Sequence, residues 1–180
     1  LHVLRQRGDV EVVGLLSTVR EDDGRATMQE VAREVLHAQA RATRLPLLEV
    51  ALPDPCANPD YERRMAAALG DAASRWPGLR TIAFGDLLLE DLRDWRAARM
   101  ARIGWEIETP LFGCDTAALA RAMLRGGLRA QLCCVDTTQL DAAFAGRAFD
   151  ASLLDALPAG VDPCGERGEF HTCVHAGPMF

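Results

Sequence analysis

Short apolar runs alternate along the chain with longer segments in which apolar residues recur every three or four positions. The first run, 10–19, is rich in Val and Leu and predicts a strand that is buried on both faces. The segment 28–44 has the spacing of an amphipathic helix, which would end before Pro46. The same reasoning predicts further strands at 47–52 and 79–84 and further helices at 61–75 and 88–103.

This order of elements predicts an α/β fold with a Rossmann-like parallel sheet that carries helices on both faces. After it, 105–112 can be a fourth strand or a connection. The pattern then predicts a helix at 115–125, capped by Asp115, and another strand at 128–135, followed only by short pieces. We therefore predict two domains, an α/β domain over 1–109 and a small α+β subdomain over 110–180.

In parallel sheets, ligands bind beyond the carboxyl ends of the strands. Four residues fall at such ends in the predicted sheet: Ser17, Thr18, Gly85 and Asp86. Glu90 and Asp91 follow in the first turns of a helix, where the helix dipole alone would explain acidic residues. The sequence leaves a functional and a structural interpretation of this acidic segment open.

The net charge of −6 and the isoelectric point near 5.2 indicate no basic surface for nucleic acid or anionic lipid. Small-molecule chemistry is therefore the better expectation. All 20 positive side chains are Arg, so the chain offers no lysine base and contains no Walker A loop. The series Arg93, Arg96 and Arg99 predicts a solvated helix face.

The six cysteines have neither the density nor the spacing of a disulfide scaffold. No apolar stretch is long enough for a signal peptide or a membrane span, so we expect a cytoplasmic protein. The chain opens without Met and already in a helical pattern. We therefore expect that further residues precede Leu1.

The most distinctive stretch of the chain is 165–172, which combines two glycines, two carboxylates, an Arg, a His and a Thr. The glycines allow sharp turns and a close approach of the backbone to a ligand. Glu166 and Glu169 could hold Mg²⁺, accept a proton or bind an ammonium group, and His171 can shuttle protons near neutral pH. The alternative is a polar surface turn that leads into an edge strand at 170–174.

The C-terminal stretch also allows a metal site. His171, Cys173 and His175 lie two residues apart and would share one face of a strand, with Cys164 upstream. The spacing contains no Cys-x-x-Cys chelate, so a packed Cys173 and a solvated His175 are the favoured interpretation. A zinc-binding protein remains a minor alternative.

Several motifs together resemble the diphthine–ammonia ligase family, a branch of the PP-loop ATP pyrophosphatases with an adenine-nucleotide α-hydrolase-like (HUP-type) fold. The resemblance spans essentially the whole chain. Its most specific block is Asp162-Pro163-Cys164-Gly165-Glu166-Arg167-Gly168-Glu169-Phe170-His171-Thr172. The other motifs are Asn58-Pro59-Asp60-Tyr61-Glu62, Phe84-Gly85-Asp86, Glu90-Asp91-Leu92-Arg93, Pro110-Leu111-Phe112, Gly146-Arg147 and Gly177-Pro178-Met179-Phe180.

The resemblance implies amide formation through adenylation. A carboxylate attacks the α-phosphorus of Mg²⁺-bound ATP, pyrophosphate leaves, and ammonia displaces AMP from the acyl-adenylate. The protein aligns the reacting groups and stabilises charge. ATP and Mg²⁺ are thus the implied cofactors, and a carboxylate acceptor and ammonia the implied substrates. A homodimer is left open, and neither nucleic acid nor a membrane is expected as a partner.

Carried over onto this sequence, the resemblance implies three groups of site residues. Catalytic roles would fall to Asp86, Glu166, Glu169 and His171; substrate binding to Tyr61, Gly165, Gly168 and Thr172; and nucleotide binding to Ser17, Thr18, Met28 and Gly85. Asp86 would orient Mg²⁺ or the acceptor. The two glutamates would bind metal or ammonium and take its proton.

The family's phosphate-binding loop, Ser-Gly-Gly-Lys-Asp-Ser, does not occur in these residues, because the sequence has no Lys. We expect that this loop precedes Leu1. The Ala- and Arg-rich composition is typical of a GC-rich bacterial genome, whereas diphthine is a modified histidine of archaeal and eukaryotic elongation factor 2. A bacterial relative would therefore amidate a different carboxylate. A second hypothesis is a nucleotide-binding module that has lost catalysis.

Overall fold

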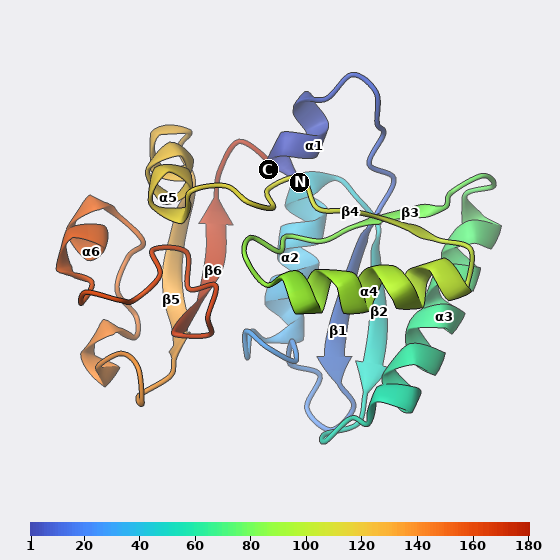
Figure 1. Cartoon of the computed structure of the whole chain (residues 1–180), viewed down its shortest axis with the longest axis horizontal. Coiled ribbons are helices and arrows are strands. Elements are labelled where there is room, and N and C mark those ends of the chain that lie inside the picture. Colours follow the sequence, from blue (N-terminus) through green and yellow to red (C-terminus); the bar gives the residue numbers. More distant parts are fainter.

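A computed structural model describes all 180 residues of the chain, which form a mixed α/β structure (Figure 1). No helix combines the length and the apolar character that crossing a lipid bilayer requires. The elements, in chain order, are α1 (His2–Gln6), β1 (Leu15–Arg20), α2 (Arg33–Thr43), β2 (Leu47–Leu52), α3 (Asn58–Arg75), β3 (Thr81–Ala83), α4 (Glu90–Arg102), β4 (Glu106–Glu108), α5 (Thr116–Arg125), β5 (Arg129–Val135), η1 (Ala142–Phe144), α6 (Ala151–Ala156) and β6 (Phe170–Ala176).

The strands form three separate pairs. β1 and β2 are parallel over their whole length, with Leu15 opposite Leu47 and Arg20 opposite Leu52. β3 and β4 are parallel over three residues each, whereas β5 and β6 are antiparallel. The α/β class predicted from the sequence is thus confirmed, but the strands do not join into one continuous parallel sheet.

The chain itself covers the edge of β1 that faces away from β2. Ala26 forms an antiparallel bridge with Val19, and the Arg20 amide donates a hydrogen bond to the Arg25 carbonyl at 2.8 Å. These contacts occupy the main-chain groups at the carboxyl half of β1. These main-chain groups are therefore not free to pair with a further strand.

One predicted helix begins later than the hydrophobic pattern indicates. The helix predicted at 28–44 begins only at Arg33, because the preceding residues form a turn. Glu30 has a left-handed φ of 56°, and the Ala26 amide donates to the Val31 carbonyl at 2.9 Å. A left-handed residue interrupts a right-handed helix, so the apolar period extends beyond the helix itself.

Other predicted elements are confirmed. β2 has the predicted bounds, and β5 begins one residue after the predicted start at 128. α5 follows Asp115, whose carboxylate accepts a hydrogen bond from the Ala118 amide at 2.7 Å, as expected of a helix cap. In these segments the local sequence signal and the tertiary contacts agree.

The buried hydrophobic side chains form clusters, each of which contains residues from only one side of position 110. The largest cluster contains only residues after position 110, namely Ala120, Ala130, Leu132, Leu140, Phe149, Leu153 and Phe170. Two smaller clusters, around Trp105 and around Met65, contain only earlier residues. We call residues 1–109 the N-terminal unit and residues 110–180 the C-terminal unit; the boundary itself stays a prediction.

The two units lie side by side, with the two chain ends close together (Figure 1). Four side chains reach from one unit to the main chain of the other. The contacts are Arg5 Nη1 to the Met179 carbonyl at 2.8 Å, Gln39 Nε2 to the Val174 carbonyl at 2.7 Å, Cys133 Sγ to the Gln29 carbonyl at 3.3 Å, and the Leu87 amide to Glu166 Oε1 at 2.7 Å.

Candidate functional site

The loop that precedes β6 is organised around a buried carboxylate. Glu169 is only 2% exposed, although it lies in a glycine-rich polar segment. Its Oε1 accepts a hydrogen bond from the Asp162 amide at 2.8 Å, and its Oε2 accepts one from the Arg167 amide at 3.0 Å. Both oxygens of this predicted catalytic residue are therefore engaged by the loop's own backbone.

Asp162 makes a second set of contacts in the same loop. Its Oδ1 accepts a hydrogen bond from the Cys164 amide at 2.8 Å, and its Oδ2 accepts one from the Thr116 hydroxyl at 2.7 Å. The second contact ties the loop to the first turn of α5. Asp162 is buried and belongs to the most specific motif, yet the sequence did not single it out as a site residue.

The two glycines predicted to bind substrate differ in their surroundings. Gly165 has a left-handed φ of 70°, and a Cβ atom there would lie 2.5 Å from the Phe170 carbonyl oxygen. Gly168 has a φ of 84°, but a Cβ there would meet nothing within 4 Å. Gly165 thus allows a close approach of the loop to its own strand, whereas Gly168 faces open space.

Glu166 points out of this loop toward the N-terminal unit. Its Oε1 accepts hydrogen bonds from the Leu87 amide at 2.7 Å and from the Leu88 amide at 3.3 Å. Its Oε2 makes no hydrogen bond within the chain. The contact brings the C-terminal loop to the segment that follows β3, next to Asp86, so two motifs that lie about 80 residues apart in the sequence meet here.

Asp86 is paired with a residue that the sequence placed on a solvated helix face. Its Oδ1 accepts a hydrogen bond from Nη1 of Arg96 in α4, and the Arg96 guanidinium lies 4.5 Å from the ring centroid of Phe84. Asp86 is 9% exposed, and its Oδ2 has no hydrogen-bond partner. The carboxylate is thus held on one side and free on the other.

Tyr61, predicted to bind substrate, lies in the first turn of α3 beside this pair. Its ring centroid is 5.9 Å from that of Trp95, at an interplanar angle of 43°. Burial raises the pKa of the Tyr61 hydroxyl; the charge of Arg96 lowers it and that of Asp86 raises it. Tyr61, Asp86 and Arg96 therefore share one electrostatic environment.

The remaining predicted residues of the C-terminal motif lie in β6. His171 is opposite Cys134 and Thr172 is opposite Leu132 in the antiparallel ladder. Because neighbouring strand residues point to opposite faces, the two side chains cannot serve the same face of the sheet. At most one of the two side chains can therefore face the reacting groups.

The residues predicted to bind the nucleotide lie on three segments. Ser17 and Thr18 are in the middle of β1 rather than at its end, which is at Arg20. The Thr18 hydroxyl is 2.6 Å from that of Thr27, and the next residue, Met28, is 63% exposed in a turn. The fourth residue, Gly85, directly follows Phe84 after β3. The two threonine hydroxyls thus link the turn to the strand.

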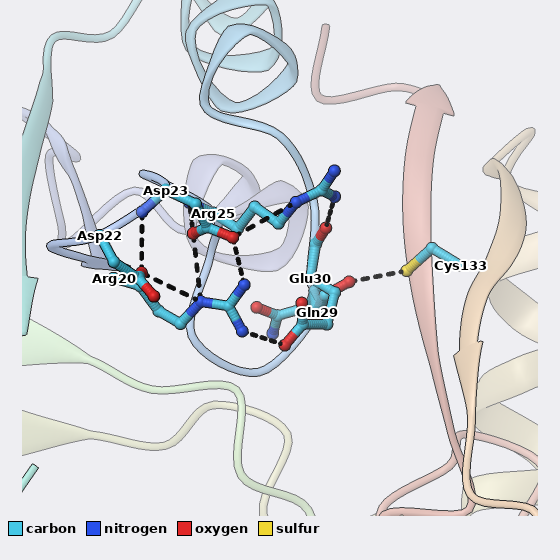
Figure 2. Close-up of polar contacts among 7 residues, drawn as sticks. All are labelled: Arg20, Asp22, Asp23, Arg25, Gln29, Glu30 and Cys133. Atoms are coloured by element: carbon cyan, nitrogen blue, oxygen red, sulfur yellow. Dashed lines mark hydrogen bonds and ion pairs between the residues drawn. The ribbon is translucent and has the colours of Figure 1, made fainter. Parts of the chain in front are cut away.

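Charged side chains shape this turn (Figure 2). Arg20 lies among carboxylates: it pairs with Asp23 and with Glu30, the latter at 2.9 Å. Figure 2 also shows the Gln29 carbonyl, which accepts a hydrogen bond from Cys133 Sγ of β5 at 3.3 Å. The end of the turn that carries Met28 is therefore held both by the ion pair of Arg20 with Glu30 and by the hydrogen bond from Cys133 to Gln29.

The C-terminal unit carries the decisive likeness to known proteins. Residues 115–180 match the family model of the diphthamide synthase C-terminal domain. The match includes the loop built by Asp162, Glu166 and Glu169, and it confirms for this part the resemblance stated above. No curated protein matches the chain.

The thiol of Cys164, within the residues that match this family model, is partly shielded. Burial raises the pKa of Cys164 to about 12, and the nearby charges of Asp162 and Glu166 act in the same direction. The Cys164 thiol donates a hydrogen bond to the Thr116 carbonyl at 3.3 Å. Because the thiolate is the metal-binding and nucleophilic form, this residue is poorly suited to either task.

The described side chains form no ready-made site for zinc or for Mg²⁺. No three His, Cys, Asp or Glu side chains come together as a metal-binding group, so the zinc alternative gains no support from His171, Cys173 and His175. Mg²⁺ is commonly held by one or two carboxylates together with substrate phosphates. Glu166, with its free Oε2, fits that requirement.

Arg96 is the functional candidate that the sequence missed. Three arginines at intervals of one helical turn are typical of a solvated face. In the structure each stacks on an aromatic ring, with guanidinium-to-centroid distances of 4.1 Å for Arg93 over Phe112 and 4.3 Å for Arg99 over Trp95. The aromatic partners come from other segments or from the same helix, so the spacing of the arginines gives no signal for them.

Proposed function

We propose that this chain works in an ATP-dependent, amide-forming ligase of the diphthine–ammonia ligase type. The reaction would adenylate a carboxylate and transfer ammonia to it, with release of pyrophosphate and AMP. The supporting observation is the contact of Glu166 with the Leu87 and Leu88 amides. It joins the segment that matches the diphthamide synthase C-terminal domain to the residues that directly follow Asp86.

In this proposal the carboxylates have different roles. Glu169 would hold the loop rather than take part in the chemistry, because both its oxygens are engaged. Glu166 would orient the segment after β3 through Oε1 and offer Oε2 to Mg²⁺. Asp86 would face the reacting groups through its free Oδ2. Only one of His171 and Thr172 would face the reacting groups, because adjacent residues of β6 point to opposite faces.

The nucleotide would lie against the N-terminal unit in a Rossmann-like arrangement of its two parallel strand pairs. Leu16 of β1, Ile82 of β3 and Ile107 of β4 pack against one hydrophobic cluster around Trp105. Parallel strands that share a core bring their carboxyl ends to one side, where ligands bind. Ser17, Thr18, Met28 and Gly85 remain the proposed nucleotide contacts.

ATP–pyrophosphate exchange in the full-length gene product tests the proposal. Exchange that depends on an added carboxylate, first elongation factor 2 bearing diphthine and then free amino acids and peptides, is the expected result. Glu166→Ala should reduce this exchange, whereas Asp155→Ala, on the exposed face of α6, should not. Tight binding of Mg²⁺-bound ATP without exchange for any carboxylate would contradict the proposal.

A nucleotide-binding module without catalysis is the second candidate. The same exchange experiment separates the two functions. A module would bind ATP but leave the exchange rate at background.

A further inference from the structure

Asp86 and Arg96 each carry a buried polar atom without a partner. Asp86 Oδ1 is paired with Arg96, whereas its Oδ2 accepts no hydrogen bond. Nε of Arg96 also donates to no acceptor. Buried polar atoms without partners are rare and cost free energy, so they need an explanation. A ligand that donates a hydrogen bond to Asp86 Oδ2 would provide one for that atom.

The free oxygen of Asp86 sets the chemistry of such a ligand. Oδ2 needs a hydrogen-bond donor, and its burial requires a small one. The Arg96 guanidinium already offsets the carboxylate charge, so a divalent cation would gain little there. Ammonia is small, donates N–H groups and is uncharged in its reactive form. It matches the oxygen better than a metal ion does.

Resting on the ligase function proposed above, we infer that Asp86 Oδ2 binds the ammonia nucleophile and that Arg96 is the residue that positions it. One N–H of ammonia donates to Oδ2, and the nitrogen lone pair attacks the acyl carbon of the acyl-adenylate. The C–N bond forms as the bond from the acyl carbon to the AMP oxygen breaks. AMP leaves with the electron pair, and the proton lost by nitrogen passes to Oδ2 and then to water.

Two contacts fix Asp86 in the orientation that this role needs. Arg96 holds Oδ1 while its guanidinium stacks on Phe84, which precedes Asp86 by two residues. From the other side, Glu166 holds the Leu87 amide, directly after Asp86. The carboxylate is therefore preorganised with Oδ2 as its only free acceptor, which is how positioned groups lower a reaction barrier.

Carbon-13 NMR of the Asp86 carboxyl carbon tests the inference without ATP or an acceptor. The probe is ammonium chloride at alkaline pH, where part of the ammonium is present as ammonia. Sodium chloride at equal ionic strength is the control, and loss of the signal in Asp86→Asn assigns it. The expected result is a saturable shift with ammonium chloride only. A shift that sodium chloride reproduces, or no shift, would overturn the inference.

Arg96→Lys tests the positioning role, because it keeps the positive charge but removes the planar guanidinium. Ammonium affinity should fall at least about tenfold, which is about 1.4 kcal/mol of binding free energy. The matched control is Arg93→Lys, since Arg93 pairs with Asp94 and stacks on Phe112 without contacting Asp86. Equal affinities of the unaltered protein and Arg96→Lys would overturn the role of Arg96.

The ammonium-binding measurement does not depend on the proposed function, so a failure of either claim can be recognised separately. Ammonium-specific binding without carboxylate-dependent ATP–pyrophosphate exchange would remove the ligase reaction and, with it, the role of ammonia as nucleophile. Exchange without ammonium-specific binding would leave the ligase function and remove only this inference. Both measurements together decide each claim separately.

Discussion

Two loops at the junction of the units hold buried carboxylates in opposite ways. In the loop before β6, Glu169 engages both oxygens with main-chain amides of its own loop. In the loop after β3, Asp86 engages one oxygen with Arg96 and leaves the other without a partner. Both residues are almost fully buried. Burial therefore does not separate them, whereas their hydrogen-bond partners do.

The difference indicates which carboxylate can take part in a reaction. A carboxylate whose oxygens are all satisfied has a structural task, because a ligand would have to break existing hydrogen bonds to reach it. A carboxylate with a free oxygen has already lost its hydration and gains by binding a donor. The loop before β6 thus has a structural task, whereas in the proposed reaction the loop after β3 would supply the carboxylate that takes part.

Removal of the Glu169 carboxylate should have one of the two largest effects on stability, together with Gly165→Ala. Glu169→Ala leaves the buried Asp162 amide and the partly buried Arg167 amide without acceptors, at about 1–3 kcal/mol for the first and less for the second. The free energy of unfolding, measured by urea denaturation, should fall by about 3 kcal/mol. Asp155→Ala, at an exposed position of α6, should leave it unchanged.

Cys164 provides a local measure of the same change. Its thiol is half-buried and has a raised pKa in the intact loop, so alkylation near neutral pH should be slow. In Glu169→Ala the opened loop should expose Cys164 and accelerate its alkylation, detected by mass spectrometry of the modified peptide. Unchanged stability together with slow alkylation would show that Glu169 does not hold the loop.

Substitution of the two glycines in the loop before β6 should lower stability to different extents. Gly165→Ala places a Cβ against the Phe170 carbonyl and adds the cost of a left-handed φ, for a loss of about 2–4 kcal/mol. Gly168→Ala meets no atom and pays only the backbone term of about 1–2 kcal/mol. Thermal or urea unfolding of both variants measures the difference, and equal losses would contradict the close approach at Gly165.

Asp86→Asn should destabilise less than Glu169→Ala. The amide oxygen of Asn can still accept from Arg96, whose side chain is 23% exposed and can relax toward water. We expect a loss of about 1 kcal/mol in the free energy of unfolding. Carboxylate-dependent amide formation should nevertheless stop, because the proton acceptor is gone. A stable variant with full amide formation would reverse the roles assigned to the two loops.

The smallest effect on stability is expected at the link between the loops. Glu166→Ala removes one acceptor shared by the Leu87 and Leu88 amides, which lie partly at the surface, at a cost of about 1 kcal/mol. Hydrogen exchange at these two amides should accelerate. Glu166→Gln keeps an acceptor oxygen and should retain most of their protection, so equal exchange in both variants would contradict the contact.

The elements that the sequence predicts well are those in which local signals decide the conformation. β2 and α5 follow from an apolar run and from a capping Asp115, and both are confirmed. The turn before α2 could not be predicted, because its apolar spacing continues that of the helix. The left-handed φ of Glu30 depends on contacts with Arg20 and with the main chain around Ala26.

The sequence predicted which residues make up the candidate site, but not which of them stabilise the loop and which face the neighbouring unit. Glycines and carboxylates at 165–172 indicate an unusual loop, yet nothing local shows that Glu169 is buried and Glu166 points outward. Whether a carboxylate faces its own backbone or a neighbouring unit depends on residues far along the chain, such as Leu87. Arg96 was missed for the same reason, since Asp86 and Phe84 lie outside its helix.

Four of the hydrogen bonds that join the units pair a side chain with a main-chain group. Main-chain groups are the same for nearly every amino acid, so the accepting or donating position can change its residue without loss of the contact. Substitutions at Val174 or Met179 therefore require no compensating change at Gln39 or Arg5. Methods that infer contacts from correlated substitutions should consequently find little signal from these four contacts, and more from side-chain pairs at the same junction such as Arg93 and Phe112.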